Sequence, residues 1–224
     1  NRDARRVVLT DIAAAPQIRD TGTGEALASL EGAGSLVYAA AFGPEGKLIA
    51  TGGGDGKVRV WDGTTGSLRK TIDMDRQGEV ICVAFDAVAA RIAAGGSRLT
   101  PAGAKQGILR MWDLSSPDPS PRSATLGREI TAVAFSPDGQ RIAAGDTDGR
   151  VKVWSASADE SQAMQGGHEG RVSAVAFSRD GRQLISGGND RMLRVWDVNT
   201  GNEVASLAGH AGGISSIAVS PEGN

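Results

Sequence analysis

The 224-residue sequence contains one cysteine, two histidines and few aromatic residues, which make up 4% of the chain. The lone Cys82 excludes an intramolecular disulfide framework, and no His or Cys cluster has the spacing of metal ligands. No apolar run approaches the roughly 20 residues of a membrane-spanning helix, and the N-terminal NRDARRVVLT lacks the apolar centre of a signal peptide. The net charge of −2 gives no bulk attraction to nucleic acid or to an anionic membrane. We therefore expect a globular, cytoplasmic protein that binds neither nucleic acid nor membranes and requires no cofactor or metal.

What the chain does have is an internal repeat. Four segments share a pattern that ends in Trp followed by Asp or Ser: GKVRVWD at 56–62, GILRMWD at 107–113, GRVKVWS at 149–155 and RMLRVWD at 191–197. The tryptophans are separated by steps of 51, 42 and 42 residues. A repeat of about 40–45 residues that closes with Trp-Asp is typical of the blades of a β-propeller.

The clearest repeat covers 166–207 and contains four short strand patterns separated by turn residues. We denote them strands a to d, and they cover 172–177, 183–188, 192–197 and 203–207. Strand a is an almost continuous apolar run, VSAVAF, as expected for a fully buried innermost strand. Each repeat therefore predicts one four-stranded antiparallel sheet.

The same pattern divides the whole chain into the units of a single domain. These units cover approximately 1–30, 31–72, 73–126, 127–165 and 166–207, followed by a partial unit at 208–224 that would complete the first blade if the ring closes. The connection between strands b and c is eight residues longer in the third unit than in the fourth, because the third unit carries the insertion SRLTPAGAKQG at 97–107. With the partial units at both ends included, the chain supplies twenty strands, which is five blades' worth.

The repeat resembles the WD40 family, and the likeness covers essentially the whole chain. Regular, alanine-rich stretches such as VAFSPDGQRIAAG also resemble bacterial WD40 arrays. The resemblance implies an all-β fold, a WD40-type β-propeller with five blades' worth of four-stranded antiparallel sheets. Rings of this family mostly have seven blades, so two arrangements remain open. Either strand a at 214–219 joins the sheet of residues 5–9 and closes a five-bladed ring, or the chain is part of a larger, seven-bladed ring that missing blades or another chain complete. We favour the larger ring, because both chain ends fall within one repeat.

Four residues of the clearest repeat match a structural tetrad of the family: His168, Ser186, Asp190 and Trp196. In the family, such residues form a hydrogen-bonded chain from Asp through His and Ser to the Trp indole N–H. Ser, His and Asp together are also the composition of a nucleophilic triad. Because no G-x-S-x-G elbow surrounds Ser186, we predict the structural role and no enzymatic activity.

The other repeats keep only part of this tetrad: Thr51, Asp55 and Trp61 in the second, Trp112 in the third, Asp148 and Trp154 in the fourth, and His210 in the partial unit. In the fourth repeat, Leu126 and Ala144 occupy the positions of the histidine and the serine. In a closed five-bladed ring, the partners of His210 would be Leu9, Ala13 and Arg19, which cannot serve. This mismatch also favours the larger ring.

Two loops have the composition of cofactor sites without their spacing. TGGGDGKV at 51–58 lacks the spacing of a phosphate-binding loop, and it joins two strands rather than a strand and a helix. DTDG at 146–149 resembles the start of a calcium loop, but the twelfth position is Ser157 rather than Glu. We predict hairpin turns at both places.

Propellers of this family most often serve as platforms for partners, which bind on the face that carries the b–c loops. We therefore predict a non-catalytic scaffold that binds a protein or peptide on this face. The candidate contact residues lie at the start of strand a, in b–c turns or in the insertion: Tyr38, Arg76, Arg98, Lys105, Arg128, Glu129, Asp146, Arg171 and Asn189. The alternative is a regulatory or sensor region of a larger multidomain bacterial protein, whose catalytic or switch domain lies outside this chain.

Overall fold

A computed structural model describes residues 5–10, 14–34, 36–74, 78–88, 90–116, 121–157 and 160–220. This part of the chain is all-β: nineteen strands form five antiparallel sheets, and one short 3-10 helix spans Pro44–Gly46. The prediction of an all-β propeller fold with five successive sheets is therefore confirmed. Within each sheet the strands follow one another in chain order, so every hydrogen-bonded neighbour is also the neighbour in sequence.

The bounds of the strands match the repeat pattern closely. The first sheet contains β1 (Arg6–Leu9), β2 (Gln17–Asp20) and β3 (Ala26–Ser29). The second contains β4 (Val37–Phe42), β5 (Leu48–Gly53), β6 (Lys57–Asp62) and β7 (Leu68–Asp73). The third contains β8 (Glu79–Phe85), β9 (Arg91–Leu99), β10 (Lys105–Asp113) and β11 (Arg122–Leu126). The fourth contains β12 (Ile130–Phe135), β13 (Arg141–Asp146), β14 (Val151–Ser155) and β15 (Ser161–Ala163), and the fifth contains β16 (Val172–Phe177), β17 (Gln183–Gly188), β18 (Leu193–Asp197) and β19 (Glu203–Leu207).

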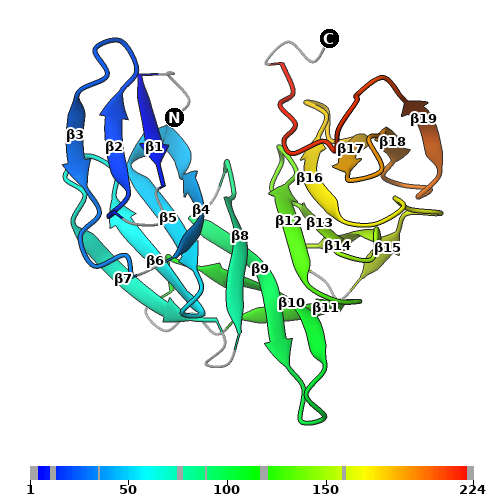
Figure 1. Ribbon diagram of the computed structural model, residues 1–224, viewed down its shortest axis with the longest axis horizontal. Coiled ribbons are helices and arrows are strands. Elements are labelled where there is room, and N and C mark those ends of the chain that lie inside the picture. Colours follow the sequence, from blue (N-terminus) through cyan, green and yellow to red (C-terminus); the bar gives the residue numbers. More distant parts are fainter. Residues whose placement is uncertain are drawn as a thin grey trace.

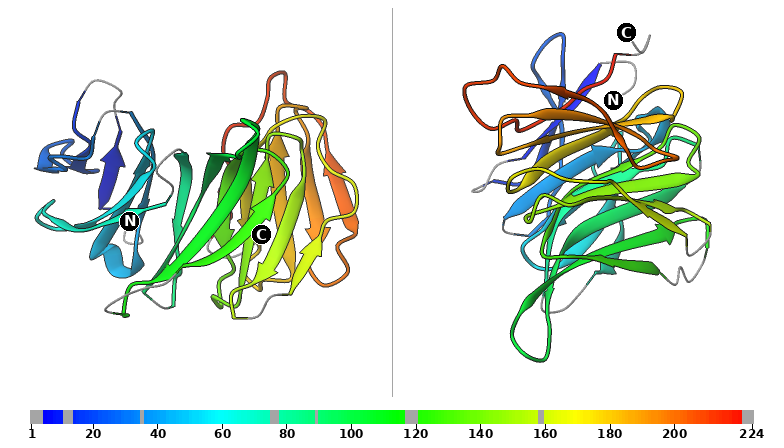
Figure 2. Two further views of the ribbon diagram at one scale, coloured as in Figure 1. Left: turned by 90° about the horizontal axis from the view of Figure 1, so that it is seen from below. Right: turned by 90° about the vertical axis from the view of Figure 1, so that its right-hand side faces the viewer.

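The five sheets follow one another around an arc, with the first sheet at one end and the fifth at the other (Figure 1). Views from two further directions show the same succession along the molecule (Figure 2). The innermost strands are neighbours: β4 contacts β8, β8 contacts β12, and β12 contacts β16. The first and fifth sheets face each other across the open side of the arc in Figure 1.

Because each sheet is a meander, its turns alternate between two ends. In each four-stranded sheet, the end where the first strand begins also carries the turn between the second and third strands. We call it the b–c end; it comprises the first residues of β4, β8, β12 and β16 and the turns at 54–56, 100–104, 147–150 and 189–192. In the four-stranded sheets, the connections from the first to the second strand and from the third to the fourth strand lie at the opposite end.

The insertion at 97–107 extends the third sheet rather than forming a long loop. β9 and β10 are nine residues long and pair from Arg91 with Asp113 to Leu99 with Lys105, so only residues 100–104 remain as the turn. The resulting hairpin projects beyond the neighbouring sheets (Figure 1).

The strand predicted over 214–219 is not assigned in the structure, and the described residues after Leu207 contain no strand. The Ile214 N–H donates a hydrogen bond to the Gly188 carbonyl at 3.0 Å, so this segment lies against the fifth sheet. β1 pairs with β2 alone, which leaves the first sheet with three strands among the described residues. A strand requires a hydrogen-bonding neighbour along its length, and the segment does not find one in β1.

Buried glycines allow neighbouring sheets to approach closely. Each faces an apolar residue of the following unit: Gly52 faces Val80, Gly95 faces Ile130, Gly145 faces Val172, and Gly187 faces Ile214. A Cβ atom at these glycines would lie 2.3–2.6 Å from a side-chain carbon of that residue. Ile214 thus occupies, against the fifth sheet, the place that the start of an innermost strand occupies in the other sheets.

Candidate functional site

The four residues of the predicted tetrad are joined by hydrogen bonds in the fifth sheet. Trp196 Nε1 donates to Ser186 Oγ at 2.8 Å, and Ser186 Oγ lies 2.7 Å from His168 Nε2. His168 Nδ1 lies 2.9 Å from Asp190 Oδ1. One assignment of hydrogens satisfies the whole chain: the serine hydroxyl donates to Nε2, and a proton on Nδ1 is donated to the carboxylate.

This arrangement has the order of a Ser-His-Asp triad, but its burial excludes nucleophilic attack on a bound substrate. Ser186 and Trp196 are fully buried, and the His168 side chain has no exposed surface. A nucleophile must reach the reacting atom of its substrate. The network instead ties the loop before β16 to β17 and β18, and it satisfies polar groups that would otherwise be buried without partners.

Hydrogen bonds hold Asp190 in its charged form. Burial raises the pKa of this carboxyl group, but hydrogen bonds from His168 and from the backbone N–H groups of Met192 and Glu169 outweigh burial. The pKa of Asp190 therefore lies below its usual value.

In the second sheet, the residues at the tetrad positions form different interactions. Trp61 Nε1 donates to Thr51 Oγ1 at 2.9 Å, while Ala33 occupies the position of the histidine. Asp55, which has no histidine to accept from, forms an ion pair with Arg59 at 2.7 Å. The network in this sheet is therefore divided into two separate interactions.

The third and fourth sheets depart further from the tetrad. Trp112 is buried, but its sheet has no serine or histidine in the tetrad positions. Asp148 forms ion pairs with Arg150 at 3.2 Å and with Arg128 at 3.8 Å. Trp154 is only partly buried, and among the described residues nothing accepts a hydrogen bond from its Nε1.

His210 is exposed in the segment that follows the fifth sheet. Leu9 is half exposed in β1, and Arg19 donates hydrogen bonds to Gln17. Ala13 lies outside the described residues. His210 has no hydrogen-bonded partner in the part of the chain that the structure describes.

The aspartates that follow tryptophan have a separate structural role. Asp62 accepts hydrogen bonds from the backbone N–H groups of Thr64 and Thr65, and Asp197 accepts them from Asn199 and Thr200. These backbone hydrogen bonds lower the pKa of both aspartates. Each carboxylate therefore fixes the turn between the third and fourth strands of its sheet.

The innermost strand carries a β-bulge at the same place in four sheets. In each case the bulge follows the first hydrogen-bonded residues, and it releases one residue from the ladder: Tyr38, Ile81, Thr131 and Ser173. A bulge re-aims the side chain of the extra residue. Tyr38 is 43% exposed, and its hydroxyl lies close to Gly54 in the adjacent b–c turn.

Some of the predicted contact residues are engaged within the protein. Lys105 forms ion pairs with Glu129 at 3.1 Å and with Glu79 at 3.6 Å, and the hydrogen bond to Glu129 raises the pKa of Lys105. Arg98 donates two hydrogen bonds to Gln106 across the β9–β10 hairpin. The projecting hairpin is thus tied to its neighbours by its own basic residues.

Asp146 is fully buried and so cannot touch a partner as the sequence led us to expect. Its Oδ1 accepts hydrogen bonds from the backbone N–H groups of Asp148 and Arg150, both at 2.9 Å. Burial raises the pKa of Asp146 above its usual value.

The remaining predicted contacts lie at the surface of the b–c end. Arg128 has a side chain that is 74% exposed, and Arg171 and Asn189 are also exposed. Arg76 lies outside the described residues.

A basic residue two positions before each tryptophan was missed by the sequence reasoning: Arg59, Arg110, Lys152 and Arg194. Arg194 forms ion pairs with Glu203 and Asp190, and Arg110 donates to the Met74 carbonyl. The signal was present in the repeated segments, which all contain Arg or Lys at this position.

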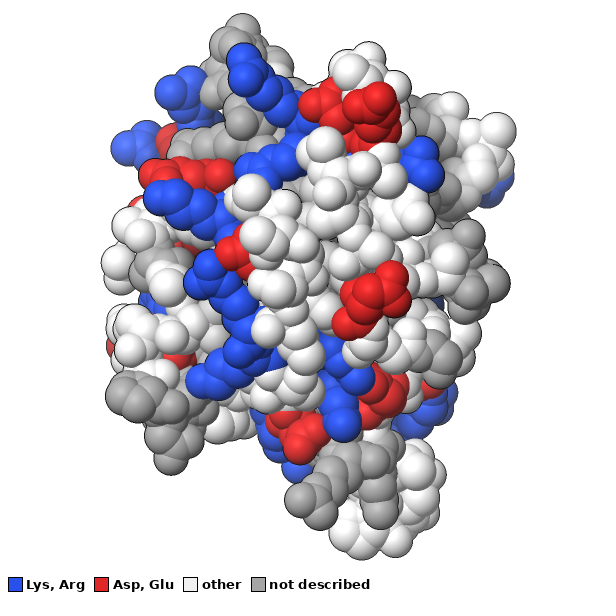
Figure 3. Space-filling model, turned by 90° about the vertical axis from the view of Figure 1, so that its left-hand side faces the viewer, with Lys and Arg blue, Asp and Glu red and all other residues white. Residues whose placement is uncertain are grey.

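The charged side chains are mixed on the side of the molecule that carries the first sheet (Figure 3). Lys and Arg form a broken line there, with Asp and Glu between and beside them.

Cys82 is buried, and burial raises its pKa to about 12. Among the described residues, no group of three or more His, Cys, Asp or Glu could hold a metal ion, and no helix has the length and apolarity to cross a membrane.

Comparison with known proteins gives the following similarities. The family model described as "WD domain, G-beta repeat" matches residues 24–62, 122–155 and 160–197. Two relatives from Oryza sativa subsp. japonica, named small ribosomal subunit proteins RACK1z and RACK1y, are 33% and 28% identical over 53% of this chain and 34% of their own length. The periodic tryptophan protein 2 homolog of Dictyostelium discoideum is 29% identical over 47% of this chain and 11% of its own length. The chain therefore spans no more than about a third of these curated relatives.

Proposed function

Because this chain belongs to the WD40 repeat family, we propose that it is a non-catalytic scaffold that binds a protein or peptide partner at its b–c end. The observation that carries this proposal is the bulge at the start of the innermost strand in four sheets. Each bulge takes one side chain out of the hydrogen-bonded ladder at the same end of the molecule. Three of the released residues, Tyr38, Ile81 and Ser173, keep exposed surface that a partner can contact, whereas Thr131 is buried and its hydroxyl bonds to backbone carbonyls.

Exposed groups around these bulges supply the chemistry of a contact surface. Tyr38 offers an aromatic ring and a hydroxyl, Arg128 and Arg171 offer guanidinium groups, and Asn189 offers an amide. Tyr and Arg are the residue types that most often dominate binding energy at protein interfaces. Asp146 is buried and takes no part in the proposed surface, and Lys105 and Glu129 hold the β9–β10 hairpin in place.

Two further observations support a binding role over a catalytic one. The Ser186, His168 and Asp190 set, which has the composition of a triad, is buried. The two rice relatives are named as proteins of the small ribosomal subunit, so their names place them in a large assembly.

The test compares two double variants that remove two exposed cations each. Arg128→Ala/Arg171→Ala changes the b–c end, and Lys47→Ala/Arg182→Ala is the matched control at the opposite end, where these side chains are 77% and 81% exposed. Immobilised wild-type protein and both variants are used to retain proteins from the source organism, and the retained proteins are quantified by mass spectrometry.

We expect at least one protein to be retained equally by the wild type and by the control, but at least fivefold less by Arg128→Ala/Arg171→Ala. A fivefold loss corresponds to about 1 kcal/mol of binding free energy. Thermal stability should not change, because exposed ion pairs such as Arg128–Asp148 contribute little. Equal retention by all three proteins, or an equal loss of binding and stability, would contradict the proposal.

We further propose that additional blades or another chain complete the ring, so that these sheets form one part of a larger propeller or of a regulatory region in a multidomain protein. Large apolar side chains are exposed in the first and fifth sheets, which border the open side of the arc: Val7, Leu9, Leu27, Val204 and Leu207. Apolar surface on terminal repeats is normally covered. The intact mass of the protein from its source, with light scattering in solution, tests this; a monomer with the mass of the 224-residue chain contradicts it.

A further inference from the structure

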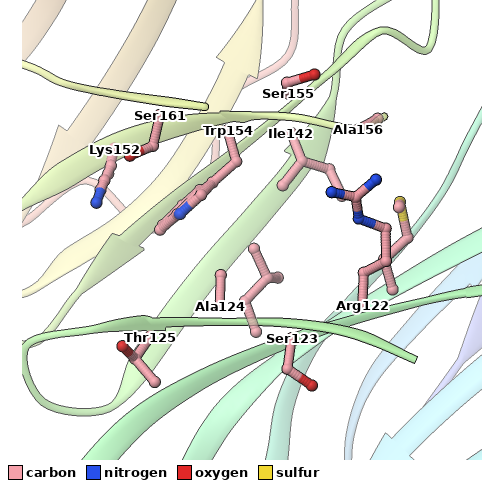
Figure 4. Close-up of a pocket in the computed structure, with 12 residues that line it drawn as sticks. Arg122, Ser123, Ala124, Thr125, Ile142, Lys152, Trp154, Ser155, Ala156 and Ser161 are labelled. Carbon is pink, nitrogen blue, oxygen red and sulfur yellow. The ribbon is translucent and has the colours of Figure 1, made fainter. Parts of the chain in front are cut away.

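A cleft between the third and fourth sheets lies apart from the b–c end, near the turns that join the third and fourth strands. It has a volume of about 300 Å³ and is lined by residues of β10, β11, β13, β14 and β15 (Figure 4). We propose that this cleft binds an apolar group that carries a carboxylate, as in the C-terminal residue of a peptide or in a small carboxylic acid.

Trp154, in this cleft, differs from the tryptophans at the same position of the other sheets. Trp61, Trp112 and Trp196 are at most 2% exposed, whereas Trp154 is only partly buried. Trp61 and Trp196 also donate to a hydroxyl of their own sheet, while the position that would serve Trp154 holds Ala144. The indole ring of Trp154 projects into the cleft (Figure 4). Its N–H group is therefore available to a bound ligand.

Lys152 is the second exception at the same place. The equivalent residues Arg59 and Arg194 form ion pairs at 2.7 Å, and Arg110 donates to a backbone carbonyl. The Lys152 ammonium instead lies 5.4 Å from the centre of the Trp154 ring, and among the described residues no carboxylate pairs with it. A lysine that lies beside an aromatic ring and has no acidic partner can form an ion pair with an anionic ligand.

The cleft exists because one wall has a small side chain and another is a short strand. The facing strand β11 contributes the small side chain of Ala124, and β15 has only three residues. Leu109, Ile142 and Ala156, all buried, form an apolar floor. Ligand sites typically combine such an apolar lining with a few polar groups that fix orientation.

The charges of the lining select an anion and limit its size. The twelve lining residues include two cations, Lys152 and Arg122, and no acidic residue. These two side chains lie on opposite sides of Trp154 (Figure 4), so a single anionic group meets one cation. One ammonium with an adjacent N–H group suits a carboxylate, whereas a phosphate is usually held by several convergent donors. The volume is at the lower limit for ligand pockets and suits a group of side-chain size.

The experiment uses the four tryptophan indole N–H signals of the 15N-labelled protein in two-dimensional NMR. Trp154→Phe identifies the Trp154 signal by its loss. The probes are N-acetyl-leucine, which carries a carboxylate, and N-acetyl-leucinamide, which has the same apolar group without the charge. We expect the acid to shift the Trp154 signal in a saturable manner, with the other three signals unchanged, and to bind at least tenfold more tightly than the amide.

Variants test which groups of the cleft are responsible. Lys152→Met should weaken binding of the acid at least tenfold, Lys152→Arg should largely preserve it, and Ala124→Leu should abolish it by filling the cleft. Lys70→Met, on β7 and outside the cleft, is the matched control and should bind like the wild type. A dispersed spectrum establishes that a variant is folded. If Lys152→Met does not fold, Lys152→Arg and Ala124→Leu still test the proposal.

The proposal is overturned if neither probe shifts the Trp154 signal, if the amide binds as well as the acid, or if Lys152→Met binds like the wild type. A hexapeptide that ends in leucine distinguishes the two sources of the carboxylate. Binding at least tenfold tighter than N-acetyl-leucine assigns the cleft to a peptide C-terminus, and equal binding assigns it to a small carboxylic acid. The outcome is independent of whether a partner binds at the b–c end.

Discussion

Replacing Ser186 by alanine removes the group that connects Trp196 to His168. The hydroxyl accepts from the indole N–H at 2.8 Å and lies 2.7 Å from His168 Nε2, in a site that is fully buried. The alanine therefore leaves two buried polar groups without a partner. Each such group costs about 1–3 kcal/mol, so we expect Ser186→Ala to lower the free energy of unfolding by about 2–6 kcal/mol.

The second sheet supplies the comparison for one unpaired group. Thr51→Val keeps the shape of the side chain but removes the oxygen that accepts from Trp61, and no histidine depends on it. We expect a loss of about 1–3 kcal/mol, smaller than the loss for Ser186→Ala. Ser206→Ala, at an exposed position of β19, controls for the substitution itself and should cost less than about 1 kcal/mol.

The fourth sheet shows how the same positions are filled without a network. It holds Leu126 and Ala144, so the double variant His168→Leu/Ser186→Ala copies a combination that this protein already contains. Removing both partners together should cost less than the sum of the single changes by about 1–2 kcal/mol.

Urea unfolding followed by far-ultraviolet circular dichroism measures these free energies. The reasoning is refuted if Ser186→Ala costs less than about 0.5 kcal/mol, if it costs no more than Thr51→Val, or if the effects of His168→Leu and Ser186→Ala simply add.

Two further predictions concern the packing of the sheets and their turns. Gly95→Ala should lower the free energy of unfolding by about 1–3 kcal/mol, and with it the midpoint of thermal unfolding by several degrees. The reason is that the added Cβ would lie 2.4 Å from Ile130 Cγ2 and 2.8 Å from Cys82 Sγ. Gly212→Ala, where no atom lies within 4 Å, should have little effect, and an equal effect would argue against close packing as the cause. Stability should fall as the pH drops below about 4, because the lowered pKa values of Asp62 and Asp197 mean that the unfolded chain binds more protons in this range. Asp62→Asn/Asp197→Asn should flatten this acid decline in thermal unfolding scans, and an unchanged midpoint between pH 5 and pH 3 in the wild type would contradict the assignment.

The succession of strands could be predicted from the sequence because it depends on residues that are close in the chain. The strands predicted at 172–177, 183–188 and 203–207 have the same bounds in the structure, since apolar runs and turn residues act over a few positions. The composition of the tetrad in the fifth sheet was also visible, because the spacing of its members follows the repeat.

What the tertiary structure decided are the contacts between residues that lie far apart in the chain. The burial of Asp146, the ion pairs that Lys105 forms with Glu79 and Glu129, and the extension of the 97–107 insertion into a hairpin depend on neighbours that the sequence does not place. The exposure of Trp154 likewise depends on the small side chain that β11 presents from the preceding sheet.

The sequence by itself therefore determined how many sheets form and what each contains, and the tertiary structure decided which surfaces remain open. Strand and turn patterns are local and are repeated five times, so an ambiguous strand boundary in one unit can be assigned from the equivalent positions of the others. The space between two sheets is set by side chains from both, as Gly187 and Ile214 illustrate. A residue's exposure at such a junction depends on the volume of a partner some 25 to 50 residues away, and no periodicity in one strand encodes that volume.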